Sequence, residues 1–162
     1  MRYELHMTDR IVIRPAKADD SDFVAGLVSS LLQFGSPAWE DTDALAPGFR
    51  DVLVDAVRAQ DPRAAVLIAQ GADGTPLGFI SLKMAADVTG VERGHVADLA
   101  VRDDVRRAGV GRALMQAGEA WARERGLPAL SLDVWSTNQP ALAFYRALGY
   151  HPESLCLIKM LG

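Results

Sequence analysis

The chain has 162 residues, enough to bury a core of its own, so we expect a single domain over residues 1–162. Its 17 basic and 21 acidic residues give a net charge of −4, which argues against nucleic acid as a partner. One cysteine and three scattered histidines argue against an internal disulfide and against a metal site. No apolar run approaches the ~18 residues of a membrane span, and residues 1–10 lack a signal peptide's apolar core, so we expect a cytoplasmic protein with no membrane partner.

The first part of the chain predicts one strand followed by two helices. The β-branched run at residues 11–13 indicates a strand that ends at Pro15. Asp19 or Asp20 is expected to cap a helix whose apolar residues recur at helical spacing until Gly35. A loop is predicted over residues 36–46. The second helix is predicted to begin near Pro47, with one apolar face formed by Phe49, Val52, Leu53, Ala56 and Val57.

The rest of the chain predicts five strands and two helices. Strands at residues 65–69 and 77–84 are joined by a Gly/Pro-rich hairpin turn. Helices are predicted over residues 109–125 and 140–148, and the remaining strands over residues 95–101, 130–135 and 155–160. This order predicts an α/β mixed sheet.

The segment at residues 101–114 joins a predicted strand to a predicted helix and carries the clearest chemical signal. A helix start leaves unpaired N–H groups and a partial positive charge, which suit phosphate oxygens. Gly109 and Gly111 let the backbone approach an anion closely. Positive charge is added by Arg106, Arg107 and Arg112. The segment therefore predicts a diphosphate site. The alternative is that the glycines only make the start of the helix more flexible and that the arginines are solvated and bind no ligand.

Two other phosphate-binding loops fit this segment less well. The dinucleotide fingerprint needs a third glycine where this chain has Leu114, and the Gly-Lys-Ser/Thr ending of a Walker loop occurs nowhere in the sequence.

Four segments of the sequence resemble those of the GNAT superfamily of N-acetyltransferases. Arg106-x-x-Gly109-x-Gly111 matches in full the family's central motif Arg/Gln-x-x-Gly-x-Gly/Ala. Asp98-Leu99-Ala100-Val101 resembles the family's fourth strand, and Ile13-Arg14-Pro15-Ala16 resembles its first. Asn138-x-x-Ala141-x-x-Phe144-Tyr145-x-x-x-Gly149-Tyr150 resembles the segment that carries the family's Asn and Tyr. The resemblance spans about residues 11–161.

The resemblance implies a single GNAT-like domain of class α/β (α+β). Its mixed, mostly antiparallel sheet would be splayed between strands 4 and 5, flanked by about four helices, with acetyl-CoA as acetyl donor in the cleft and no metal. A homodimer is a further expectation from the family. The residues that the resemblance implies for acetyl-CoA binding are Leu99, Ala100, Val101, Arg106, Arg107, Ala108, Gly109, Val110, Gly111, Arg112, Asn138, Ala141 and Tyr145.

The family's reaction implies direct attack of an amine on the thioester in a ternary complex, with Tyr145 as general acid for the departing thiolate. Three residues are candidates for the general base. We favour His95 because its pKa lies near neutral, while Asp98 is unusual in an apolar strand and Glu92, in the preceding loop, could act through a water. Strand alternation puts His95 and Asp98 on opposite faces unless a bulge intervenes. Each candidate also has a purely structural alternative. His95 could be a packing residue, Asp98 a hydrogen-bonded structural carboxylate and Glu92 a solvated charge in the loop.

The acceptor is expected to be a primary amine, and a small amine, a peptide N-terminus and a lysine side chain all remain open. Carboxylates beside aromatic side chains would suit a cationic amine, although the same segment also reads as an acidic surface loop with Trp39 in the core. The segment holds Phe34, Trp39, Glu40, Asp41 and Asp43. The rival functions are a non-catalytic acyl-CoA-binding regulatory module and a nucleotide-binding regulatory domain.

Overall fold

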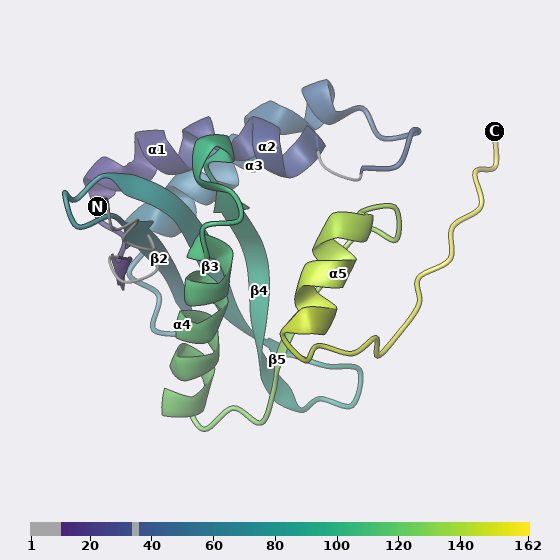
Figure 1. The fold of residues 1–162 in the computed structure, drawn as a ribbon. Coiled ribbons are helices and arrows are strands. Elements are labelled where there is room, and N and C mark those ends of the chain that lie inside the picture. The colour runs from purple at the N-terminus through teal and green to yellow at the C-terminus, as the bar shows by residue number, and fades with distance from the viewer. Residues whose placement is uncertain (1–10, 34–35) are drawn as a thin grey trace, which may run out of the picture.

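The computed structural model describes residues 11–33 and 36–162, which form one five-stranded sheet with helices on both faces (Figure 1). The strands lie in the sheet in the order β1-β2-β3-β4-β5. Neighbours are antiparallel from β1 to β4, and β5 runs parallel to β4. The strands are β1 (Val12–Pro15), β2 (Ala64–Gln70), β3 (Pro76–Ala86), β4 (Glu92–Val101) and β5 (Leu130–Leu132). The predicted hairpin therefore joins β2 to β3.

The helices divide between the two faces of the sheet. They are α1 (Ser21–Gly26), α2 (Val28–Gln33), α3 (Thr42–Arg58), α4 (Val110–Glu124) and α5 (Gln139–Ala147). On one face Leu53 of α3 packs in a core with Phe79 of β3, and on the other Leu114 of α4 packs with Ile80. Phe79 and Ile80 serve different cores because successive strand residues point to opposite faces. Figure 1 shows α1, α2 and α3 gathered apart from α4. The predicted fold class is confirmed.

The sheet opens between β4 and β5. These strands pair only where Gly94–Val96 face Leu130–Leu132, whereas β4 continues beside β3 as far as Val101. From Asp98 to Val101, the outer edge of β4 therefore faces no strand in the described part of the chain. The predicted splay between the fourth and fifth strands is present.

A bulge interrupts the pairing of β3 with β4 next to this opening. Ser81 pairs with Asp98 and Leu82 pairs with Val96, so Ala97 has no partner on β3. An extra residue in one strand reverses the alternation of side chains beyond it. The two predicted base residues on β4, His95 and Asp98, consequently share one face.

Two predictions for the N-terminal helices are wrong in detail. The helix α3 begins at Thr42 instead of Pro47, because Asp41 Oδ1 accepts a hydrogen bond from Ala44 N at 3.0 Å and caps the helix. The predicted loop over residues 36–46 is thus wrong from Thr42 onward, and Pro47 lies inside the helix.

In place of the first predicted helix the structure has two short helices, α1 and α2, which are separated at Leu27. The side chain of Asp20 does not cap α1, because its carboxylate accepts hydrogen bonds from Arg14 Nη1 and Nη2 at 2.7 and 2.8 Å. Phe34 and the predicted stop at Gly35 lie outside the described residues, as does His6.

The C-terminal strand predictions also differ from the structure. Residues 155–160 make no strand, and residues 151–162 run extended and exposed away from the rest of the molecule (Figure 1). The strand β5 ends at Leu132 instead of Trp135. The two differences belong together: residues 155–160 do not pair with β5, so the outer edge of β5 has no neighbouring strand among the described residues to extend its pairing. None of the described helices is long and apolar enough to cross a bilayer.

Candidate active site

The loop between β4 and α4 has the backbone shape expected of an anion site. Gly109 lies in the left-handed region (φ 85°) immediately before α4, and Arg107 also has a positive φ of 65°. The first hydrogen bond into the helix runs from Ala113 N to Gly109 O at 3.0 Å. The N–H groups of Val110, Gly111 and Arg112 precede that bond and find no acceptor among the described residues. Three adjacent donors at a positive helix end can bind phosphate oxygens.

The arginines of the loop differ in whether their guanidinium groups already have an ion-pair partner. Arg106 is held by Asp103, at 2.8 Å from Nη2 to Oδ1, and its Nη2 also donates to Ser30 Oγ at 3.3 Å. Arg107 and Arg112 are exposed and make no ion pair with the described residues. The guanidinium groups of Arg107 and Arg112 therefore remain available to an anion at the start of α4, whereas Arg106 also ties the loop to α2.

The second glycine of the motif brings α5 against the loop. A Cβ atom at Gly111 would lie 3.3 Å from Phe144 Cζ, closer than most real contacts of a Cβ atom. The ring of Phe144 in turn contacts Tyr145 edge-on, with centroids 5.2 Å apart. Gly111 thus serves the packing of α5 as well as access to the backbone, and it brings the helix that carries Tyr145 to the anion site.

Two further residues of the predicted cofactor set hold α5 in shape. Asn138 Oδ1 accepts a hydrogen bond from Ala141 N at 3.2 Å and caps the helix. This cap gives Asn138 and Ala141 a structural role, and their contact with acetyl-CoA stays a prediction. The backbone of Leu99, Ala100 and Val101 lies along the open edge of β4, where donors and acceptors are available to an extended ligand.

The bulge on β4 creates a polar cluster on the face covered by α1, α2 and α3. Cross-strand pairs share a face, so Asp98 lies beside Ser81 and His95 beside Lys83. Ser81 is in turn on the same face as Phe79, whose core packs against α1 and α3. Sequence reasoning missed Ser81 and Lys83, because only the register between β3 and β4 brings them to the candidate bases.

Asp98 is the most strongly perturbed carboxylate of this cluster. Burial raises its pKa from 3.8 to about 6, while the Lys83 ammonium and the Ser81 hydroxyl oppose the shift. A carboxylate with this pKa is mostly ionised at neutral pH, yet it is basic enough to take a proton from a reacting group. Asp98 is also the first β4 residue past the bulge, where β4 no longer has β5 beside it.

His95 sits in the closed part of the sheet, opposite Ser131 of β5. Its Nδ1 lies 3.1 Å from Ser131 Oγ, and that hydroxyl donates to Gly94 O at 3.2 Å. Since the hydroxyl proton is used there, His95 Nδ1 must carry the hydrogen of the histidine–serine bond. Its Nε2 lies 3.7 Å from Asp133 Oδ2. Burial lowers the pKa of His95, with Asp133 opposing and Lys83 reinforcing the shift.

Glu92 is remote from the cluster. It is the first residue of β4, so the predicted position in a loop is wrong, and its carboxylate pairs with Arg63 on the surface. Asp98 lies six positions further along the strand, a distance of about 20 Å. Glu92 is therefore too far from Asp98 to belong to the same site.

Tyr145 lies on the other side of the sheet, packed against the core of α4. Its hydroxyl makes no hydrogen bond with the described residues, and burial raises its pKa to about 12. The phenol is therefore protonated over the whole neutral range, and it is a weaker acid than the free side chain, whose pKa is about 10.

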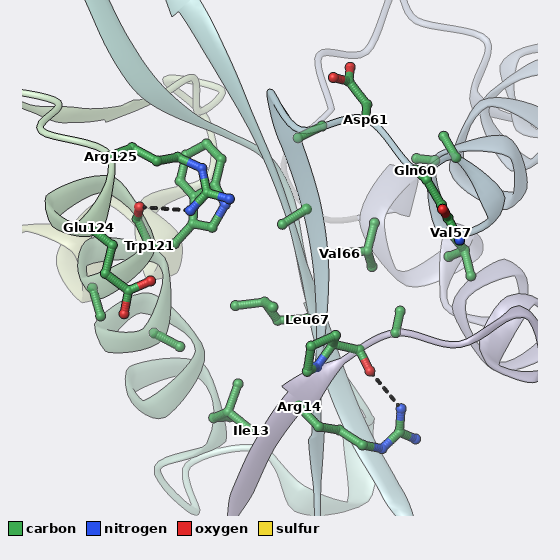
Figure 2. A pocket seen from close by; sticks show the side chains of 18 residues that line it. Ile13, Arg14, Val57, Gln60, Asp61, Val66, Leu67, Trp121, Glu124 and Arg125 are labelled. Atoms are coloured by element: carbon green, nitrogen blue, oxygen red, sulfur yellow. Dashed lines mark hydrogen bonds between the residues drawn. The ribbon is translucent and has the colours of Figure 1, made fainter.

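A groove elsewhere on the molecule is a separate feature, lined by none of the residues of this cluster. It has a volume of about 740 Å³ and lies at the edge of β2 between α3 and the C-terminal half of α4 (Figure 2). Figure 2 shows Arg125 across the ring of Trp121, with its Nη1 donating to Trp121 O at 3.2 Å. No residue of the loop, of α5 or of the polar cluster lines this groove, so it is not the predicted cofactor cleft.

A sheet opened beside a helix start that can bind a diphosphate is typical of an enzyme that works on a coenzyme A thioester. The Acetyltransferase (GNAT) family model matches residues 26–150. The chain belongs to this family. No group of three metal-ligating side chains occurs in the described ranges, 11–33 and 36–162.

The relatives of the chain act on different amines. The aminoglycoside N(6')-acetyltransferase type 1 of Klebsiella aerogenes is 40% identical over 90 residues, 54% of this chain and 59% of the relative. The peptidyl-lysine N-acetyltransferase YiaC of Escherichia coli is 38% identical over 79 residues, 49% of this chain and 45% of the relative. The chain thus spans about half the length of these curated relatives. A GCN5-related N-acetyltransferase structure from Ralstonia eutropha shares the fold, with a TM-score of 0.73, 24% identity and coverage of 94% and 99%.

Proposed function

We propose that this protein transfers the acetyl group of acetyl-CoA directly to a primary amine in a ternary complex. The observation that carries the proposal is the open start of α4, with three free N–H donors and Gly109 in the left-handed region, directly beside the open edge of β4. The family assignment supports acetyl-CoA as the donor. The amine-modifying relatives support a primary amine as the acceptor.

Binding of the donor rests on two neighbouring surfaces. The N–H groups of Val110, Gly111 and Arg112 would hold the diphosphate, with Arg107 adding charge. The backbone of Leu99 to Val101 would pair with the amides of the extended pantetheine arm, much as a strand would. When bound, the thioester supplies the activated acetyl group, and its carbonyl would lie in the opening between β4 and β5.

Asp98 is the general base of the proposed reaction. The placement of His95 in the closed part of the sheet makes it the weaker candidate, although it was the favoured one from sequence. An amine becomes strongly acidic once it has attacked a carbonyl carbon, so a base with a pKa of about 6 can accept its proton. Holding amine and thioester together supplies much of the remaining acceleration, since oriented reactions reach effective molarities of about 10⁵ M or more.

Tyr145 would stabilise the departing sulfur. Full transfer of the phenol proton to a thiolate of pKa about 8.5 would be uphill by about 5 kcal/mol, at 1.36 kcal/mol per pH unit and a pKa of about 12 for Tyr145. We therefore assign Tyr145 as a hydrogen-bond donor to the sulfur: the carbon–sulfur bond breaks to give a thiolate that this hydrogen bond stabilises, the phenol keeps its proton, and the proton lost by the amine passes to Asp98.

Acetyl-CoA binding by two glycine variants tests the loop. Gly109→Glu puts a carboxylate at the diphosphate site, whereas Gly126→Glu makes the same change at the far end of α4, where the glycine also has a positive φ, of 68°, and open space around it. Both variants carry the same backbone strain, of order 1–2 kcal/mol. We expect calorimetry to show loss of acetyl-CoA binding for Gly109→Glu alone. Equal affinity in the two folded variants would contradict the proposal.

An acceptor screen tests the reaction itself. Release of the coenzyme A thiol is measured with small amines, with a peptide of free N-terminus and with an N-blocked lysine peptide. We expect release that depends on one of these amine classes. Tight acetyl-CoA binding without release toward any amine would identify the non-catalytic acyl-CoA-binding module instead.

A further inference from the structure

The face of the sheet that carries Asp98 also carries an exposed lysine. The core beneath α1, α2 and α3 includes Phe79 on β3 and Ala100 on β4. Further along β3 on the same face, the Lys83 side chain is exposed. The register places Lys83 opposite His95 and diagonally across from Asp98, at a Cα separation of about 7–8 Å. An acceptor amine that reaches Asp98 therefore comes close to the Lys83 ammonium.

Lys83 differs from the next cation on this face, Arg93, in having no counter-ion. Arg93 lies two residues before His95 on β4, and its guanidinium is already occupied. Its Nη2 lies 2.5 Å from Asp87 Oδ2, and its Nη1 lies 2.6 Å from Glu153 Oε1. Lys83 makes no ion pair with the described residues. Its ammonium group is therefore available to an anionic group of a ligand on this face.

The proposed reaction makes this free charge matter more. An acceptor amine arrives as an ammonium ion, which the Asp98 carboxylate attracts and the Lys83 ammonium repels. When Asp98 then takes up the proton of the amine, the negative charge that offsets Lys83 disappears. An acceptor with a carboxylate next to its amine solves both problems, because its two charges match Asp98 and Lys83 in sign and its carboxylate stays beside Lys83 after the proton has moved.

One further carboxylate on this face favours a different kind of acceptor. Asp133 follows β5, and its Oδ2 lies 3.7 Å from His95 Nε2. It would attract an acceptor with a second positive charge. Its side chain is 99% exposed, however, so water screens its attraction for a ligand. A second ammonium beside the first would also lie near Lys83, which disfavours diamines as acceptors.

We infer that the acceptor is an amino acid whose amine is directed to Asp98 and whose carboxylate is bound by the Lys83 ammonium. The short spacing of the two side chains fits an amine and a carboxylate on the same or on adjacent carbon atoms. The amine nitrogen bonds to the thioester carbon, the carbon–sulfur bond breaks to give the thiolate, and the proton of the amine passes to Asp98. Lys83 keeps its protons throughout. The inference rests on the proposed acetyl transfer and narrows its acceptor.

The first test compares matched acceptors. Release of the coenzyme A thiol from acetyl-CoA is measured with a panel of free amino acids and with the carboxamide of each, which keeps the amine and the side chain but lacks the negative charge. We expect kcat/KM to be higher for the acid of the best pair by about tenfold or more, the effect of one charge-assisted hydrogen bond. The amine of the amide is the less basic one and is more often neutral, so amine protonation cannot explain a preference for the acid.

The second test assigns the preference to Lys83. Lys83→Gln removes the charge at an exposed position, so the variant should keep the circular dichroism spectrum of the parent, and its acid-to-amide ratio should fall to about one. Lys17→Gln removes the same charge at an exposed position after β1 and should keep the ratio of the parent. Lys83→Glu reverses the charge and should prefer a diamine to an amino acid.

The possible failures of the inference and of the proposed function give different results. Thiol release with equal kcat/KM for acids and amides, or an acid preference that Lys83→Gln leaves unchanged, would overturn the inference while acetyl transfer to an amine stands. A parent that prefers diamines would also overturn it and would indicate Asp133 as the residue that selects the acceptor. Acetyl-CoA binding without thiol release toward any amine or amino acid would overturn the inference and the proposed function together.

Discussion

Asp98→Asn should make the protein more stable and less active at neutral pH. Asp98 is half-buried beside the opening of the sheet, and this partial burial raises its pKa from 3.8 to about 6. A carboxyl whose pKa is higher in the folded state binds its proton more tightly there than in the unfolded chain. The ionised form is therefore disfavoured by folding, and asparagine removes that cost while keeping a similar shape.

The size of the effect follows from the two pKa values. The interval from 3.8 to about 6 corresponds to about 3 kcal/mol, at 1.36 kcal/mol per pH unit. Below pH 3.8 both states hold the proton, so there is no cost. Stability is lost as the pH rises through this interval, and the whole cost is present above about pH 6. Asp98→Asn should thus gain up to about 3 kcal/mol in unfolding free energy at pH 7.5 and little near pH 3.5.

Urea unfolding of the parent and the variant at a series of pH values measures this difference directly. Asp55→Asn, an exposed carboxylate change on α3, is the matched control and should show no such pH-dependent gain. Acetyl transfer should fall by about 10²- to 10⁴-fold in Asp98→Asn, and the rise of the parent's rate near pH 6 should vanish. A variant that is destabilised equally at both pH values, or that keeps the parent's pH–rate curve, would refute the reasoning.

Three further outcomes follow from the site. Tyr145→Phe should lower kcat by about tenfold or more with an unchanged acetyl-CoA dissociation constant, because the hydroxyl is assigned to the departing sulfur; equal kcat values would remove it from the reaction. Gly111→Val should weaken acetyl-CoA binding and lower the melting temperature together, because its side chain meets Phe144 of α5. His95→Gln should keep the pH–rate curve of the parent, and loss of the limb near neutral pH would instead identify His95 as the base.

The sequence predicted the parts of the fold that depend on local pattern. The hairpin between β2 and β3, the helix α4 and the loop before it follow from turn residues, apolar spacing and the two glycines. The start of α3 was mistaken because two signals compete there. Pro47 favours a helix start, but the Asp41 carboxylate, six residues earlier, caps the helix with a hydrogen bond that only the folded backbone reveals.

The site was harder to predict because its geometry depends on pairing between strands. The bulge at Ala97 has no sequence signal of its own, and it decides that His95 and Asp98 share a face with Ser81 and Lys83. The motif found the loop, the glycines and Tyr145, whereas the choice among three base candidates required the register of β4. For the same reason the strand predicted at residues 155–160 is wrong: its spacing is strand-like, but a strand also needs a neighbour to pair with, and none pairs with it.

The opening in the sheet would let Asp98 and Tyr145 serve one reaction centre although they lie on different faces, with Asp98 at the amine and Tyr145 at the sulfur. Tyr145 belongs to the α4 and α5 side, whereas Asp98 belongs to the side of α1, α2 and α3. Wherever the strands pair, the sheet itself lies between side chains on its two faces and keeps them apart. They can serve one reaction centre only where β4 and β5 part, and β4 places Asp98 at that point. The thioester would then enter from the face of the phosphate loop and the amine from the opposite face, which gives the two substrates separate routes to one reaction centre.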